Sequence, residues 1–196
     1  MAIVPETRPR LSYGELLPRV TAAGLNTDAH PVFVVGIRGY YDRSMGKPGN
    51  DRGIYDDAIF LVSPAFFGAY NGNTDPSGRR PGAGYGAGKG MARLTPGVWL
   101  VHRFDKHKGE YDALCQRAGD VTVLRDGLSE DYPDTGMFGI NIHCGRKTST
   151  SSAGCQTIYP DQWPSFIESA HDQARRYHGD AWRKTTIPYV LLVDAD

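Results

Sequence analysis

The sequence predicts one domain of the α+β class with a mainly β core. Strand-like runs outnumber helical ones, and their irregular spacing lacks the strand–helix alternation of a doubly wound sheet. The chain has 196 residues, of which 40% are hydrophobic and 22% charged, so it is long enough to bury a sizeable core. We expect residues 1–29 to form an N-terminal helical extension and residues 30–196 to form the main domain.

The first predicted element is a short helix over residues 12–23. Ser12 and Glu15 have the spacing of a capping box, in which each side chain satisfies a free backbone N–H of the first turn. Gly24 supplies a stop signal at the other end. Pro18 lies inside this segment, so the helix should be kinked or shortened there.

The predicted strands follow as short runs rich in β-branched and aromatic residues. They cover residues 32–37, 58–62, 98–104, 121–124, 138–143 and 187–193. A helical turn is expected at residues 111–117, between two of these strands. Residues 71–90 hold most of the glycine clustering, together with Ser-Gly and Pro-Gly turn signals, and should form a long exposed loop.

The last predicted helix covers about residues 161–178. Asp161 is the expected N-cap, and Gly179 is the expected stop. Apolar residues recur at helical spacing along this segment, which indicates one buried face. They are Trp163, Phe166, Ile167, Ala170, Ala174 and Tyr177.

The charge balance indicates no polyanionic partner. Lys and Arg together number 22, as do Asp and Glu, so neither nucleic acid nor an anionic membrane surface is expected to bind. The first residues lack the basic start and the apolar stretch of a secretory signal, and no run approaches about 18 apolar residues. We therefore expect a protein that is cytoplasmic on synthesis and has no stable membrane association.

Cys155 is the candidate nucleophile. The cysteines of the chain are three in number and cannot all pair with one another, so at least one thiol is free. Ser152, Ala153 and Gly154 supply no bulk to bury the cysteine, and glycine permits a tight turn that leaves backbone N–H groups free to bind an oxyanion. This setting is typical of acyl-transfer enzymes in which a thiolate attacks.

His143 is the candidate base. Apolar and polar residues alternate in the strand predicted around it, so His143 shares a face with Asn141 and points away from the apolar side. It lies twelve positions before Cys155, across a loop short enough to fold back. No acidic residue lies between them. The imidazole is therefore oriented by a backbone carbonyl, by a hydroxyl, or by an acid from elsewhere such as Asp134 or Asp120.

Other site types fit the sequence less well. A zinc site would need His143 and its neighbour Cys144 to bind from opposite faces of a strand, and no Cys-x-x-Cys is present. The glycine-rich residues 82–90 depart from the phosphate-loop and dinucleotide patterns, and the Asn-rich stretch before them departs from a calcium loop. His102 and His107 are expected to be solvated surface residues, the alternative being that they line a site for a carboxylate.

These residues resemble a known family, the L,D-transpeptidase catalytic domain, also called the YkuD-like fold. Its motif is a histidine on a strand followed by Ser/Thr-His-Gly-Cys, and Ile142-His143 and Ser152-Ala153-Gly154-Cys155 are similar to it. Thr95-Pro96-Gly97 resembles the upstream Thr-Pro-x-Gly stretch of the family. The phage-associated branch is nearer still, over a likeness that spans about residues 30–195. Its members carry runs similar to residues 73–77, 121–127, 138–143 and 151–158.

The resemblance implies a β-rich catalytic domain over residues 30–196 that cleaves peptidoglycan stem peptides. It implies that Cys155 forms an acyl-enzyme, that His143 acts as general base and then acid, and that backbone amides around Gly154 bind the oxyanion. The implied substrate contacts are Ser152, Ala153, Gln156, Thr157 and Asn141. It further implies a monomeric lytic enzyme of phage type, without cofactor or metal, that reaches the cell wall once the membrane is permeabilised.

Some positions depart from the family pattern. Ala153 stands where the motif has a histidine, and Gln156-Thr157 replaces the apolar-Arg pair that helps to bind a substrate carboxylate. Two alternatives to hydrolysis remain open. One is true L,D-transpeptidation, which cross-links peptidoglycan, and the other is a non-catalytic wall-binding or virion module that keeps the fold.

Overall fold

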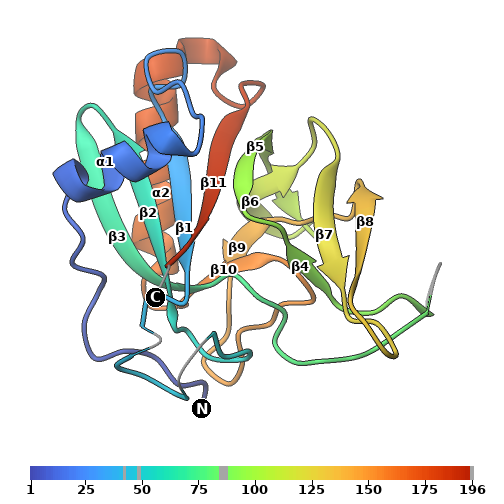
Figure 1. Ribbon diagram of the computed structural model, residues 1–196. Helices are drawn as coiled ribbons and strands as arrows, with labels where there is room; N and C mark the ends of the chain where they lie inside the picture. The colour runs from blue at the N-terminus through green and yellow to red at the C-terminus, as the bar shows by residue number, and fades with distance from the viewer. Residues whose placement is uncertain (42, 48–49, 84–87, 195–196) are drawn as a thin grey trace.

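The computed structural model describes residues 1–41, 43–47, 50–83 and 88–194. The main sheet contains β1 Phe33–Arg38, β2 Asp57–Ser63, β3 Phe66–Asn73, β5 Gly97–His107, β6 Tyr111–Gln116, β9 Ile142–Cys144, β10 Gln156–Ile158 and β11 Ile187–Val193. These strands close on themselves in the order β1-β11-β5-β6-β9-β10-β3-β2 (Figure 1). The pairs β1–β11 and β9–β10 are parallel, and the other neighbours are antiparallel.

A second, antiparallel sheet stands beside the closed one, on the right of Figure 1. Its strands are β4 Ala92–Leu94, β7 Val121–Arg125 and β8 Tyr132–Gly136, in the order β4-β7-β8. Leu94 and Val123 are fully buried and belong to the same hydrophobic cluster as the inward side chains of the closed sheet. The two sheets therefore share one core.

The helices are α1 Tyr13–Ala22, α2 Trp163–His178 and the short 3-10 helix η2 Gly179–Ala181. The predicted capping box of α1 is confirmed, because the Ser12 side chain accepts from the Glu15 N–H and the Glu15 side chain accepts from the Ser12 N–H. Pro18 lies inside α1, yet the helix continues to its last turn, so the predicted shortening does not occur. No helix in the described part of the chain combines the length and apolar character needed to cross a membrane.

Helix α2 is confirmed with a different start. Its N-cap is Gln162 and makes no side-chain hydrogen bond, so the predicted capping role of Asp161 is wrong. Asp161 instead forms an exposed ion pair with Lys147, with 2.8 Å between the charged atoms. Gly179 follows the helix with φ of 52°, as expected of a stop residue.

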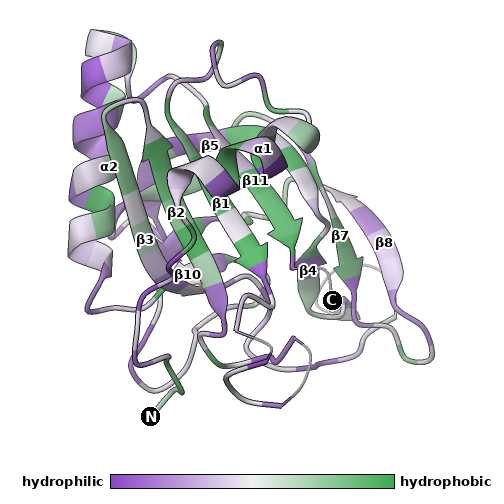
Figure 2. Cartoon of the chain, turned by 60° about the vertical axis from the view of Figure 1, so that its left-hand side comes forward, coloured by the Kyte–Doolittle hydropathy of each residue, from purple (hydrophilic) through white to green (hydrophobic). Residues whose placement is uncertain are grey.

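Strands β1 and β2 are buried on both faces because a helix covers each face. Val35 and Ile37 of β1 pack in one cluster with Leu16 of α1. Val34 points the other way, into the larger cluster that includes Phe166 of α2. Figure 2 shows α1 lying across the apolar strands of the closed sheet. Burying one large apolar side chain contributes about 1.5–3 kcal/mol, so these two layers account for much of the stability.

Residues 111–117 form a strand in place of the predicted helical turn. β6 pairs with β5 from His102↔Gln116 to His107↔Tyr111, so the partner strand decides its conformation. The sequence also missed β3, β4 and β8, and the strand predicted over 138–143 is confined to β9, Ile142–Cys144. β8 contains Pro133, which a strand tolerates at the edge of a sheet, where its missing N–H is not needed.

The predicted exposed loop at 71–90 is only partly exposed. Asn73, Thr74 and Asp75 at its start are fully buried, and Asn73 still belongs to β3. Arg79 and Arg80 further along are exposed. Residues 84–87 of the predicted loop lie outside the described residues.

Candidate active site

A tight turn before β10 positions Cys155. Gly154 has φ of +146°, a region that favours glycine, and a Cβ here would lie 2.5 Å from the Ala92 carbonyl oxygen. The Ser152 hydroxyl accepts a hydrogen bond from the Gly154 N–H at 3.0 Å and donates one to the Cys155 carbonyl at 2.7 Å. The small residues before the cysteine therefore fold as a turn in which only glycine fits at 154.

Ser77 holds this turn from the segment that follows β3. Its hydroxyl accepts from the Ser152 N–H at 2.7 Å, and its own N–H donates to the Ser152 carbonyl at 2.8 Å. The same hydroxyl lies 2.7 Å from the Thr150 hydroxyl. These contacts fix the segment that leads into Cys155.

The sulfur of Cys155 lies against the backbone that leads into β9. Its S–H donates to the Gly139 carbonyl at 3.3 Å, and the Asn141 N–H donates to the sulfur at 3.5 Å. Burial raises the pKa of the Cys155 thiol, whereas the Asn141 N–H and the positive charge of Lys108 lower it. Because burial is the largest of these effects, the resting group is a neutral thiol.

The register of the β9–β10 pair relates Cys155 to His143. His143 lies opposite Thr157, which is two residues after Cys155. Paired residues point to the same side of a sheet, and every second residue returns to that side. Cys155 is the residue directly before β10, and continuing the alternation back by two residues from Thr157 places it on the face of His143. Asn141, two residues before His143, contacts the sulfur through its N–H.

His143 is buried, with only 4% of its surface exposed, although its neighbour Ile142 and not His143 belongs to the hydrophobic cluster. Its Nδ1 lies 2.8 Å from the Cys144 carbonyl and 3.4 Å from the Tyr111 hydroxyl. A carbonyl only accepts, so Nδ1 carries the proton and Nε2 keeps a free lone pair. Nε2 has no hydrogen-bond partner among the described residues, and it is not one of their fully buried unpartnered atoms.

The Cys144 carbonyl is therefore the group that orients the imidazole, one of the kinds that the sequence left open. Asp134 accepts from Lys89 and Arg125 instead, and Asp120 is exposed. Burial is the main cause that lowers the pKa of His143 to about 4, with the positive charges of His107 and Lys108 adding to it. The imidazole is thus neutral near pH 7, in the form that accepts a proton.

His107 is the site residue that the sequence reasoning missed. It is 6% exposed, its ring stacks on His143 with 4.0 Å between centroids, and its Nδ1 lies 3.1 Å from Asn141 Nδ2. The expectation of a solvated surface position is wrong for His107. It is also wrong for His102, which is fully buried with Nε2 2.8 Å from the Ile140 carbonyl. The signal that finds His107 is the length of β5, which runs past the predicted end at 104 and carries this side chain into the site.

The predicted substrate contacts differ in how accessible their side chains are. Ala153 is exposed and lines a cavity beside Cys155. Ser152 and Asn141 are 5% and 8% exposed, and their side chains are bonded within the protein. Ala153 is thus the predicted contact that the structure leaves accessible.

Gln156 and Thr157 are fully buried, so their assignment as substrate contacts is wrong. The Gln156 amide donates to the Gly154 carbonyl at 3.2 Å, and the Tyr189 hydroxyl donates to Gln156 Oε1 at 2.8 Å. Both residues belong to β10, which pairs on one side with β9 and on the other with β3. The Gln156 side chain therefore stabilises the turn from the protein interior, whereas the Thr157 hydroxyl has no hydrogen-bond partner among the described residues.

The predicted oxyanion donor at Gly154 is already engaged. Its N–H donates to the Ser152 hydroxyl within the turn. The Cys155 N–H makes no hydrogen bond with another described residue. In this structure the turn therefore offers the Cys155 N–H, and not the Gly154 N–H, to a developing oxyanion.

A cavity of about 270 Å³ opens beside Cys155. Its wall includes the turn residues 153–155 and the basic residues Arg80, Lys89 and Arg125. A larger cavity, of about 580 Å³, lies along the N-terminal segment and shares no lining residue with it. The smaller cavity, beside Cys155, is therefore lined both by the turn residues and by the cysteine itself.

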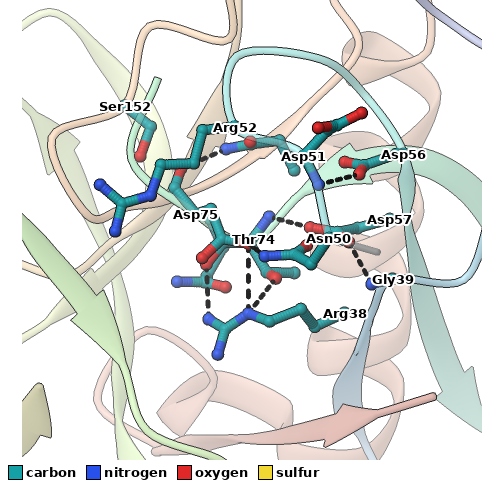
Figure 3. A network of polar contacts seen from close by, with 12 residues as sticks. Arg38, Gly39, Asn50, Asp51, Arg52, Asp56, Asp57, Thr74, Asp75 and Ser152 are labelled. Atoms are coloured by element: carbon teal, nitrogen blue, oxygen red, sulfur yellow. Dashed lines mark hydrogen bonds and ion pairs between the residues drawn. The ribbon is translucent and has the colours of Figure 1, made fainter. Parts of the chain in front are cut away.

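A buried polar network adjoins the segment that carries Ser77 (Figure 3). Asp57 accepts from the Gly39 N–H at 2.6 Å and from the Thr74 N–H at 2.5 Å. Arg38 Nε lies 3.3 Å from Asp75 Oδ2. The network therefore fixes the start of the segment whose other end holds the cysteine turn.

Two carboxylates of this network, Asp56 and Asp57, resist ionisation. Burial raises the pKa of Asp57 to about 7, with the charge of Asp75 adding to it. Burial likewise raises the pKa of Asp56 to about 8, with the charge of Asp57 adding to it. Asp56 Oδ2 accepts from the Asp51 N–H at 2.8 Å, and its Oδ1 has no partner among the described residues. Arg38 is the guanidinium that pairs with Asp75, whereas Arg52 nearby pairs with Asp126 at 2.7 Å.

The described residues contain no group of three or more His, Cys, Asp or Glu side chains arranged to hold a metal ion. Neither a protein-family model nor a curated protein matches this chain.

Proposed function

We propose that this protein is a cysteine peptidase that cleaves the stem peptide of peptidoglycan through an acyl-enzyme on Cys155. The observation that supports it is that the Cys155 thiol lies against Asn141, two residues before a neutral His143 with a free Nε2. An open cavity adjoins the thiol. The proposal includes an L,D-transpeptidase-like fold of the phage-associated branch, with which a mainly β core and two helices agree.

In the proposed reaction, His143 Nε2 accepts the thiol proton as the Cys155 sulfur attacks the carbonyl carbon of the substrate. The C–N bond then breaks, the proton passes from Nε2 to the leaving amine, and a thioester remains on the sulfur. Water gives a proton to Nε2 and attacks the thioester carbon. The acid product leaves, and the sulfur recovers its proton from Nε2.

The electrostatics favour proton transfer during attack over a preformed ion pair. The pKa of the Cys155 thiol is raised and that of His143 is lowered, so both groups are neutral before substrate binds. A charged pair forms only as the sulfur attacks. The Cys155 N–H is the donor available for the oxyanion that develops at the same moment.

His107 and Asn141 act as positioning residues in this proposal. Asn141 contacts the sulfur through its N–H and His107 through its side-chain amide, and His107 in turn stacks on His143. This chain of contacts connects the nucleophile to the base. A shift of either positioning side chain would change the distance over which the proton moves.

Purified sacculi test the proposal. The unaltered protein should release soluble muropeptides, and mass spectrometry of these fragments should identify the bond that is cut. Cys155→Ala should abolish release, and His143→Gln should slow it by about 10²–10⁴-fold. Cys144→Ala is the matched control, because this neighbouring cysteine directs its thiol to the Gly145 carbonyl at 3.4 Å. Full solubilisation by Cys155→Ala would overturn the nucleophile assignment.

Two other outcomes separate the alternatives. An added acceptor peptide that appears in cross-linked product would support L,D-transpeptidation, in which an amine replaces water at the thioester. Binding to sacculi without any release would support the non-catalytic module. The raised pKa of the Cys155 thiol, which disfavours the reactive thiolate, is the observation that favours this module.

A further inference from the structure

The cavity beside Cys155 has an unbalanced charge. Its wall contains three basic residues, Arg80, Lys89 and Arg125, and no acidic one. The chain as a whole has equal numbers of basic and acidic residues. Positive charge is therefore concentrated at this cavity beside the thiol.

Two of these cations are held in place. Lys89 Nζ and Arg125 Nε lie 2.8 and 3.0 Å from Asp134 Oδ2, and both charges lie over the Phe138 ring, at 5.1 and 4.6 Å from its centroid. Arg125 also donates to the Gly90 carbonyl at 3.1 Å. One carboxylate thus faces two cations, and a net positive charge remains at the cavity wall.

Arg80 is the third cation. Its backbone is anchored, because its N–H donates to Asp126 at 2.9 Å and its carbonyl accepts from the Met91 N–H at 3.1 Å. Its side chain is exposed, and the guanidinium makes no ion pair or hydrogen bond with another described residue. A guanidinium that is free on an anchored backbone is suited to bind an incoming anion.

We propose that this cavity binds a free carboxylate of the acyl donor, next to the carbonyl that Cys155 attacks. A guanidinium pairs with a carboxylate through two parallel hydrogen bonds, and the surrounding net charge strengthens that pair. The residues after the cysteine cannot fill this role, because Gln156 and Thr157 are fully buried. Acidic donors are therefore preferred over their amides. The substrate class rests on the proposed function, whereas the charge of the cavity does not.

Alkylation of Cys155 tests the cavity without turnover. Iodoacetate and iodoacetamide are similar in size and differ in charge, and peptide mapping gives the rate of each at each cysteine. The rate ratio of iodoacetate to iodoacetamide should be about threefold or more higher at Cys155 than at Cys144 in the same molecule. Added salt should reduce this difference, because it screens exposed charges. Equal ratios at the two cysteines would overturn the proposal.

Arg80→Gln should lower the ratio at Cys155 by about threefold and leave the iodoacetamide rate unchanged. Arg79→Gln is the matched control, because Arg79 is also exposed, pairs with Asp131 at 3.6 Å and does not line the cavity. Lys89→Gln should have a smaller effect than Arg80→Gln, because Asp134 already shares its charge. A ratio that Arg80→Gln does not change would contradict the role of Arg80.

Matched donor peptides then test the substrate class. Arg80→Gln should raise KM for a donor with a free carboxylate and leave KM for the corresponding amide unchanged. Equal KM changes for both donors would overturn the preference. Charge-selective alkylation in a protein that does not cleave sacculi would support the anion site while the proposed function fails, so the two failures are distinguishable.

Discussion

The ring of His107 lies on the ring of His143, with 4.0 Å between their centroids and 20° between their planes. Two stacked imidazoles resist being protonated together, because each positive charge would face the other. Burial lowers the pKa of both rings in addition. The pair thus keeps His143 in the form that accepts a proton.

Replacing His107 by Phe should raise the pKa of His143 above its value of about 4. Phenylalanine keeps the ring stack and removes the like charge, whereas burial persists, so the pKa should remain below the ordinary value near 6.5. An NMR titration of the His143 ring measures this change. His30→Gln is the control, since His30 lies before β1, outside the site. A pKa of His143 that falls in His107→Phe would contradict the like-charge effect.

The buried carboxylates predict that stability falls as pH rises. The pKa of Asp56 is raised to about 8 and that of Asp57 to about 7, so the folded chain binds more protons than the unfolded chain above about pH 4. This contribution to stability is complete below the unfolded pKa and is lost as pH rises through the folded pKa values. Denaturant unfolding between about pH 5 and pH 8 measures the loss.

Asp56→Asn should reduce this pH dependence. The asparagine oxygen still accepts from the Asp51 N–H, and the ionisable group is gone, so the free energy of unfolding should fall less as pH rises. Asp120→Asn, at an exposed carboxylate, should keep the slope of the unaltered protein. Identical slopes in the two variants would show that Asp56 does not hold the extra proton.

The buried histidines should cause a loss of stability at acid pH. Burial lowers the pKa of His102 and of His143 to about 4, below the value near 6.5 in the unfolded chain. The folded chain therefore binds fewer protons between these values, and this contribution is present above the unfolded pKa and lost as pH falls through the folded one. His102→Gln should flatten the acid limb of the stability curve. An unchanged acid limb would argue against a neutral, buried His102.

Gly154→Ala and Gly97→Ala separate backbone strain from steric clash. Both glycines have φ near +145°, at +146° and +144°, but a Cβ at 97 meets nothing within 4 Å whereas one at 154 meets the Ala92 carbonyl. Gly97→Ala should cost about 1–2 kcal/mol of unfolding free energy. Gly154→Ala should cost about 1–3 kcal/mol more. Equal costs, measured by denaturant unfolding, would mean that the turn relaxes away from Ala92.

The alkylation rate of Cys155 should keep rising at pH values where an exposed thiol has already levelled off. Burial raises the pKa of this thiol, and the thiolate is the reactive form. His143→Gln should leave the midpoint of the curve unchanged, because a neutral imidazole adds no charge. A curve that levels off near neutral pH would instead indicate a thiolate–imidazolium pair.

Local signals in the sequence predicted the elements that depend on few neighbours. The Ser12 and Glu15 capping box lies within one turn, and the turn before Cys155 contains the bond from Gly154 to Ser152, with Ser77 holding it from outside. The class of the fold, mainly β with two helices, also followed from such signals. These predictions are confirmed because neighbouring residues favour the observed backbone conformation.

Predictions that depended on partner strands were wrong. β6 is a strand because it pairs with β5, and the same pairing brings His107 to His143. Gln156 and Thr157 are polar residues next to a candidate nucleophile, yet the strands on either side of β10 enclose them. No spacing within the chain distinguishes an enclosed polar residue from an exposed one, because its burial comes from segments far away in sequence.

The short stretch from Thr74 to Ser77 connects the protein interior to the turn before Cys155, which affects the positions at which mutations are tolerated. The Thr74 N–H donates to Asp57 in the interior, and the Ser77 hydroxyl accepts from the Ser152 N–H at the turn before Cys155. In the proposed enzyme, selection therefore extends to positions that do not contact a substrate. A substitution at Asp57 is expected to reduce the proposed activity by displacing the turn before Cys155.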